Sequence, residues 1–112
     1  MAEQQENTLL ETVLNDLDIT FNDEVLKKKI NRIMESGKAY LEDKFGMEVD
    51  FEKDKIALEL LISYCRYGRS NAIEQFEHDF KSNLTAFALR GALKKKEAEA
   101  AGQEGADNEI KV

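Results

Sequence analysis

The segment from Ile56 to Tyr67, IALELLISYCRY, carries apolar residues on nearly every side of a predicted helix. One apolar stripe at helical spacing holds Leu58, Leu61, Ile62 and Cys65, and a second holds Ala57, Leu60, Tyr64 and Tyr67. Polar residues form only a narrow seam: Glu59, Ser63 and Arg66. A helix that is apolar around most of its circumference packs against more than one neighbour. We expect it both at the centre of a tight bundle and in contact with another copy of the chain.

Two amphipathic helices are predicted before this segment. The first covers about residues 8–17, and Asn7 or Thr8 is its candidate cap. The second is long, from about Asp23 to Phe45, and Gly46 follows it as a helix-ending glycine. Residues 47–53 alternate apolar and polar, which predicts a short extended segment that pins a loop onto the core but is too short to imply a sheet.

A further helix is predicted after Ser70 or Asn71, either of which is a candidate cap. A bend or an end of this helix is expected at Asn83 and Thr85, before Phe87. Its apolar face recurs at spacings of three and four: Ile73, Phe76, Phe80, Leu84, Phe87 and Gly91. The pattern therefore predicts an all-α protein, a small bundle of four to five helices with a long second helix and a central, apolar third helix. We expect residues 1–7 to be disordered, 8–93 to form the domain, and 94–112 to be a flexible tail that a partner could order.

Composition narrows the class of protein. The chain has 112 residues, a net charge of −7, no proline and one cysteine. This length predicts one domain, and a single cysteine predicts a reducing compartment. No apolar run is long enough for a membrane span, and the polar N-terminus lacks a signal-peptide pattern, so we expect a protein made in the cytoplasm with no membrane partner. The acidic charge argues against a dedicated nucleic-acid binder.

Candidate catalytic and metal-binding residues are few. The only histidine, His78, follows Glu74 by one helical turn, and an exposed helix histidine is the expected interpretation rather than a metal ligand. Cys65 lies on an apolar stripe, which favours a buried thiol over a nucleophile. The chain has no glycine-rich phosphate-binding motif and no paired cysteines. We therefore expect no enzyme, no cofactor and no metal.

Surface contacts are the more promising feature of this sequence. Tyrosine is amphipathic and enriched at interfaces, and a glycine on an apolar helix face permits close approach of another backbone. The candidate subunit-interface residues are Gly37, Tyr40, Ala57, Leu60, Tyr64 and Tyr67. Lys94, Lys95 and Lys96 are candidates for docking onto a larger partner, whereas Lys27 to Lys29 are interpreted as a solvated helix face.

The order of pieces from Leu14 to about Leu89 resembles the small all-α head–tail connector proteins of tailed phages and prophages. The resemblance is carried by LNDLDITFNDE (14–24), SGKAYLEDKFG (36–46), MEVDFEKD (47–54), LLISYCRY (60–67) and NAIEQFEHDFKSNL (71–84). It implies a non-catalytic ring of about a dozen subunits on the portal protein, which extends the DNA channel and docks the next head-completion or tail protein. DNA would pass through without specific binding. The implied location is the virion neck, assembled in the host bacterial cytoplasm.

A second interpretation competes with this one. A small acidic helical regulator, of the anti-repressor or DNA-mimic type, would bind a single protein partner as a monomer or dimer. A DNA mimic needs rows of carboxylates on one face, whereas the acidic residues here are scattered among lysines.

Overall fold

The computed structural model describes the backbone of residues 2–111 and the side chains of residues 8–101. Within that range the chain forms five helices and no strand: α1 (Ala2–Asp16), α2 (Glu24–Phe45), α3 (Lys55–Arg69), α4 (Ile73–Asp79) and α5 (Lys81–Lys111). The predicted all-α bundle, with a long second helix and a central third helix, is confirmed.

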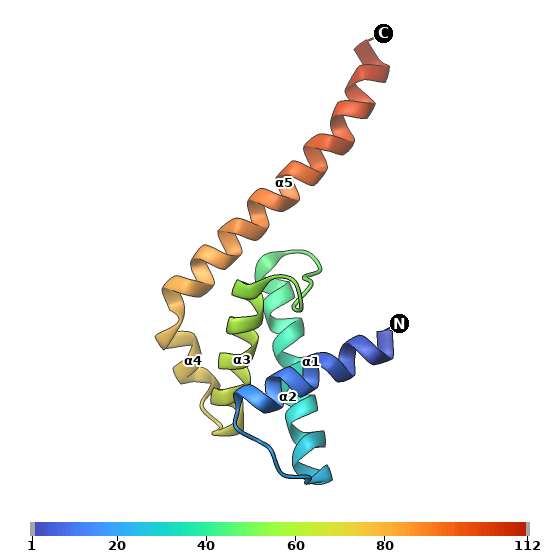
Figure 1. The fold of residues 1–112 in the computed structure, drawn as a ribbon. Helices are drawn as coiled ribbons and strands as arrows, with labels where there is room; N and C mark the ends of the chain where they lie inside the picture. Colours follow the sequence, from blue (N-terminus) through green and yellow to red (C-terminus); the bar gives the residue numbers. More distant parts are fainter. Residues whose placement is uncertain (1, 112) are drawn as a thin grey trace.

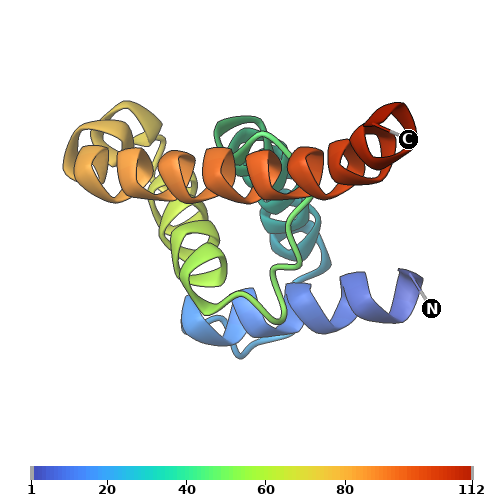
Figure 2. The same cartoon turned by 90° about the horizontal axis from the view of Figure 1, so that it is seen from above.

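The helices lie in three layers. Figure 2 shows α1 along one side, α2 and α3 in the middle, and α4 with α5 along the other side. The middle pair contact each other; α1 contacts both of them from one face, and on the other face α4 contacts α3 and α5 contacts α2. Each layer contributes fully buried side chains to one core, including Val13, Met34, Leu61, Phe76 and Phe87. Both apolar stripes of α3 are therefore covered within a single copy of the chain.

Capping residues set the ends of the middle helices. The Asp23 side chain accepts a hydrogen bond from the Leu26 amide at 3.1 Å, and the Asp54 side chain accepts one from the Ala57 amide at 3.2 Å. Gly46 ends α2 at φ 89°, the left-handed conformation predicted for it, and donates its amide to Glu42. In the loop that follows, Phe51 is buried in the core, so this segment is pinned as expected although it forms no strand.

Three helix boundaries differ from the sequence prediction. α1 begins at Ala2, so Thr8 lies inside the helix and does not cap it. α4 is preceded by Ala72 and has no side-chain cap; neither Ser70 nor Asn71 provides one. The chain bends at Phe80, between α4 and α5, rather than near Asn83 or Thr85. The helix-forming composition of residues 2–7, rich in Ala, Glu and Gln, accounts for the earlier start.

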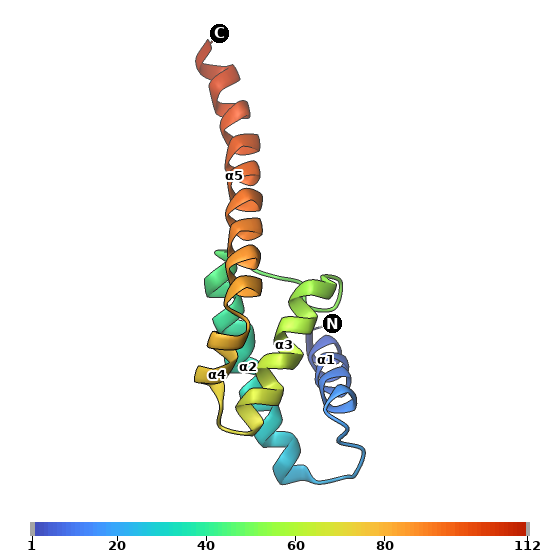
Figure 3. The same cartoon turned by 90° about the vertical axis from the view of Figure 1, so that its left-hand side faces the viewer.

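α5 is the element that leaves the bundle. Figures 1 and 3 show it starting beside α4, crossing the upper end of α2 and projecting beyond the other helices. It passes without interruption through Lys94, where the sequence predicted the tail to begin. The helix gives the molecule its elongated dimensions of 63 × 35 × 18 Å.

Candidate interaction surface

Three of the predicted interface residues are buried inside a single copy of the chain. Gly37, Ala57 and Leu60 all lie in the bundle, and Leu60 is only 4% exposed. A Cβ atom at Gly37 would lie 2.7 Å from Tyr64 Cδ1 and 2.9 Å from Leu61 Cδ1. The close approach predicted at Gly37 therefore occurs, but between α2 and α3 of the same chain. In this structure none of the three is available as an exposed contact for a second copy.

The three tyrosines form an aromatic cluster that attaches α4 to the middle layer. Tyr40, Tyr64 and Tyr67 surround the buried Phe76, with ring centroids 5.6 to 6.3 Å from it. The hydroxyl of Tyr40 donates to Glu77 at 3.1 Å, and that of Tyr67 donates to Asp79 at 2.8 Å. The three rings are half-buried, and carboxylates of α4 accept hydrogen bonds from the hydroxyls of Tyr40 and Tyr67. Their main contacts thus lie within the chain.

The same hydrogen bonds shift the ionisation of the cluster. Burial, together with the Glu77 carboxylate, raises the pKa of Tyr40 to about 12. The hydrogen bond to Asp79 raises the pKa of Tyr67, and that bond in turn lowers the pKa of Asp79. These three pKa shifts favour the neutral phenols and the charged carboxylate that the contacts require. They fit a structural role in holding α4 rather than an acid–base role.

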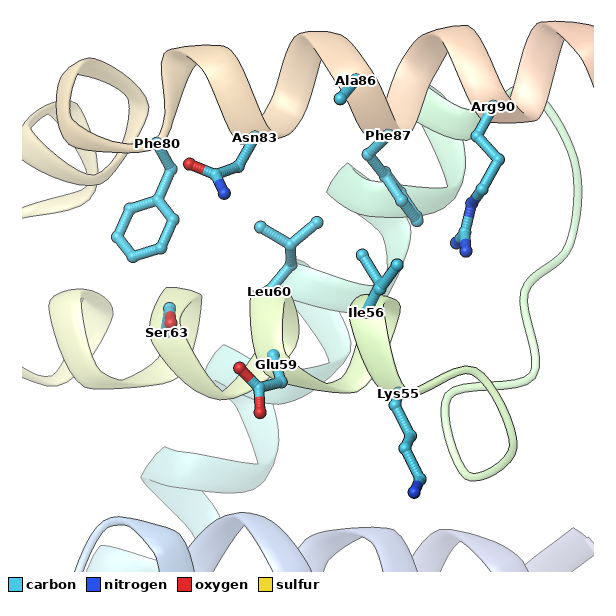
Figure 4. Close-up of a pocket in the computed structure, with 10 residues that line it drawn as sticks. All are labelled: Lys55, Ile56, Glu59, Leu60, Ser63, Phe80, Asn83, Ala86, Phe87 and Arg90. Carbon is cyan, nitrogen blue, oxygen red and sulfur yellow. The ribbon is translucent and has the colours of Figure 1, made fainter.

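An open groove lies between α3 and the first part of α5. Its volume is about 570 Å³. Figure 4 shows Phe80, Asn83 and Phe87 pointing toward α3, and Leu60 and Ile56 pointing back toward α5. Leu60 and Phe87 are buried at its floor, whereas Ile56 is 57% exposed at its edge. The groove therefore offers apolar surface that the chain itself does not cover.

Arg90 closes one end of this groove. Its guanidinium donates to Asp54 at 2.6 Å and lies 5.4 Å from the ring centroids of Phe45 and Phe87. The next residue, Gly91, packs against the end of α2, where an added Cβ would collide with the Phe45 carbonyl oxygen. The ion pair and the close backbone contact together fix the angle at which α5 leaves the bundle.

Two exposed leucines of α5 extend the apolar surface beyond the groove. Leu89 is 61% and Leu93 55% exposed, and with Ala86 they share one side of the helix because they are spaced by three and four residues. This stripe is not among the contacts predicted from the sequence. The sequence nevertheless contains it, because these residues lie on a different side of the helix from Leu84 and Phe87, which form the buried face.

The predicted docking lysines follow directly along α5. Lys94, Lys95 and Lys96 are exposed, as is every side chain described from Ala92 to Ala101. None of the three forms an ion pair within residues 8–101. They are thus placed on the part of α5 that has left the bundle.

The remaining candidate residues show no arrangement of a catalytic centre. Burial raises the pKa of the Cys65 thiol to about 12, which opposes formation of a thiolate. His78 is exposed beside Asp79 at 3.3 Å, and no group of three potential metal-ligating His, Cys, Asp or Glu side chains occurs within the described residues. No described helix is long and apolar enough to cross a membrane.

The fold and surface define a small all-α protein with an open apolar groove and a projecting helix. Comparison with models of protein families, with curated proteins and with solved structures finds no match to this chain.

Proposed function

We propose that this protein is a structural head–tail connector of a tailed phage or prophage, which assembles as a ring on the portal. The ring would extend the DNA channel and dock the next head-completion or tail protein. The proposal requires no catalysis and no cofactor. It starts from the sequence resemblance, whose five segments run from the end of α1 to the beginning of α5.

The single observation that carries the proposal is the course of α5. Its first part packs on α2 through Phe87 and Gly91, and its next part, from Ala92 to Ala101, is exposed on all sides. A helix without tertiary contacts gains only its intrinsic propensity, which is marginal in water. Contact with a larger assembly would supply the missing burial. Lys94, Lys95 and Lys96 are the residues proposed to dock on the portal.

The acidic balance is consistent with a wall past which DNA moves. A ring of copies, each with a net charge of −7, repels phosphate overall and so disfavours retention of the duplex. The exposed apolar surface around the groove supports contact with protein rather than nucleic acid. Both features suit a connector that binds proteins and lets DNA pass.

The test is mass photometry or light scattering of the full chain across concentration, alone and mixed with the portal protein of the same gene cluster. Rings of the protein alone, or a ring-sized gain in mass on the portal, are the expected results. A monomer that ignores the portal at high micromolar concentration would contradict the proposal. A stable 1:1 complex with one other protein would favour the alternative, a small acidic regulator.

A further inference from the structure

The chain reverses direction between α3 and α4 within residues 70–72. In Figure 1, α3 runs down the bundle, and α4 and α5 run back up beside it. One residue decides the reversal: Asn71 has φ 56°, in the left-handed region, whereas Ser70 and Ala72 have φ of −96° and −125°. The left-handed region is unfavourable for residues with a Cβ atom, although asparagine tolerates it better than most. Residues 70–72 therefore form a short hinge that depends on Asn71.

The first turn of α4 lacks hydrogen bonds that a longer helix would supply. α4 has no side-chain cap, and within the described part of the chain the amides of residues 73–75 have no protein acceptor. If Asn71 adopted right-handed helical dihedrals, α3 would continue into α4, and these three amides would donate to the carbonyls of residues 69–71. No proline prevents this, because the chain contains none. The turn and a continuous α3–α4 helix are thus alternative conformations of the same hinge.

The two helices after the hinge, α4 and α5, here called the arm, pack on a complementary surface of α1–α3, here called the body. The arm buries Phe76 and Phe87. The ring centroid of Phe87 lies 4.7 Å from that of Phe45 on α2. Three tyrosine rings of the body have centroids 5.6 to 6.3 Å from that of Phe76: Tyr40, Tyr64 and Tyr67. Every copy of the chain therefore carries both an aromatic docking surface and the segment that fits it.

A straight hinge would separate the arm from its own body. The arm would then continue along the axis of α3, beyond the lower end of the bundle in Figure 1. The surface with the matching shape and side chains is the body of another copy. The same contacts form in both arrangements, so the hinge conformation and the cost of association decide between them. Short hinge loops under strain favour such an exchange of identical elements.

We propose that copies of this chain join by exchanging their arms, so that α4 and α5 of one copy pack on the body of the next copy. Exchange in one direction is a heterologous contact, and repetition of it closes a ring. The inference rests on the proposed function, because it names the contact through which copies of a connector join. Tyr40, Tyr64 and Tyr67, which the sequence predicted at an interface, then contact Phe76 of a neighbouring copy. The far part of α5 stays exposed in both arrangements.

Cross-linking across the α3–α5 groove tests the exchange directly. Glu59 of the body and Asn83 of the arm are exposed and line this groove from α3 and α5 (Figure 4). In the Glu59→Cys/Asn83→Cys variant, a short bis-maleimide joins the two thiols within one chain if the arm packs on its own body, and between chains if arms are exchanged. The protein is assembled alone or on the portal, separated into monomeric and assembled fractions, treated briefly and resolved by denaturing electrophoresis.

Two controls accompany this variant. The unsubstituted chain, whose only thiol is the buried Cys65, shows whether that residue reacts. Asn31→Cys/Asn83→Cys places the second thiol at an exposed position elsewhere on the body and measures chance links between chains.

The expected result is a ladder of linked chains from the assembled Glu59→Cys/Asn83→Cys fraction, several-fold stronger than from the Asn31→Cys/Asn83→Cys control. The monomeric fraction should link only within the chain. An assembled fraction that also links only within the chain, or ladders of equal strength for both variants, would overturn the inference and leave the connector function standing. Failure of the unsubstituted chain to assemble under any condition would overturn the proposed function and this inference together.

Substitution of the hinge residue provides an independent test. Asn71 is exposed, and glycine at this position adopts the left-handed turn freely, whereas alanine favours the continuous helix. The ratio of assembled to monomeric protein, measured by mass photometry at one concentration, should be roughly five- to thirtyfold higher for Asn71→Ala than for Asn71→Gly. Asn31→Ala and Asn31→Gly, at an exposed asparagine inside α2, are the matched controls for helix propensity. Equal ratios for the two Asn71 variants, or the same difference between the Asn31 variants, would overturn the exchange.

Discussion

The two parts of α5 have similar helical backbones but very different surroundings. Between Lys81 and Gly91 the helix buries Leu84 and Phe87 and presses its backbone against Phe45. Between Ala92 and Ala101 every side chain is exposed. The first part is stabilised by burial of apolar surface, and the second only by local propensity. The difference indicates that the near part of α5 serves the fold, while the far part is available to a partner.

Removing the main anchor of the near part should have the largest effect. Phe87 is 2% exposed, and its ring centroid lies 4.7 Å from that of Phe45, with the two rings tilted. Phe87→Ala should lower the free energy of unfolding by about 3–5 kcal/mol, since it deletes a buried ring and leaves a cavity. Leu89→Ala, two residues away but largely exposed, should change it by less than about 0.5 kcal/mol. Urea unfolding followed by circular dichroism measures both, and equal losses would refute the assigned faces of α5.

Gly91→Ala tests how closely the backbones of α5 and α2 approach. In an open helix this change would stabilise the protein by about 1 kcal/mol through higher helix propensity. The added Cβ would instead collide with the Phe45 carbonyl, so we expect a loss of about 1–3 kcal/mol. The measurement is the change in unfolding free energy, and its sign distinguishes a collision from an open helix. A gain in stability would mean that α5 does not lie against α2.

The Arg90–Asp54 pair should contribute less than the apolar contacts. Both partners are partly exposed, so solvent screens their attraction, and a coupling of about 0.5–1 kcal/mol is expected. Arg90→Met keeps the apolar stem over the rings, and Asp54→Ser keeps the helix cap. A double-mutant cycle of these two changes isolates the ion pair. The coupling should shrink in high salt, and a value that is unchanged by salt would argue against an ionic contact.

Alkaline pH should loosen the aromatic cluster while leaving the far part of α5 unaffected. The folded-state pKa of Tyr40 is about 12, above its unfolded value of 10.0, so the folded state holds this proton more tightly. Its contribution is complete below pH 10 and is lost as the pH rises toward 12. Because Tyr40 is only partly buried, solvent screens its contacts, and the loss is about 1 kcal/mol or less. Tyr40→Phe should flatten this part of the stability–pH curve, and a curve identical to that of the unsubstituted protein would contradict the assignment.

Elements whose local chemistry is self-contained could be predicted from the sequence. The end of α2 depends on one residue, Gly46, and its position is as expected. The bend at Phe80 could not be found in this way, because the apolar spacing of Phe76, Phe80 and Leu84 continues through it. Hydrogen bonds from Phe80 to Phe76 and from Leu84 to Phe80 also span the break. The spacing of apolar residues indicates which positions are buried, but it does not show where the helix axis changes direction.

The candidate interface shows the same limit. The second stripe of α3, with Ala57, Leu60 and Tyr64, was predicted to face another copy, whereas within this chain it belongs to the core and α3 packs on α2 and α4. A stripe reveals that a surface is buried but not which element buries it. The exposed pair Leu89 and Leu93 could have been recognised in the sequence, since it lies on a different side of the helix from the buried face. Its exposure became evident only once α5 was placed against α2.

The far part of α5 should produce the smallest change in stability and a clear change in binding. Replacing Lys94, Lys95 and Lys96 together with glutamine keeps helix-forming residues and removes three exposed charges, so the unfolding free energy should shift by less than about 0.5 kcal/mol. If these lysines dock on the portal, the ring-sized gain in mass should weaken, most visibly at moderate salt. The matched control replaces Lys28, Lys29 and Arg32, three exposed cations of α2, with glutamine and makes the same change in net charge. Equal weakening by both variants would point to the overall charge, whereas weakening by the α5 variant alone would place the portal contact on the projecting helix.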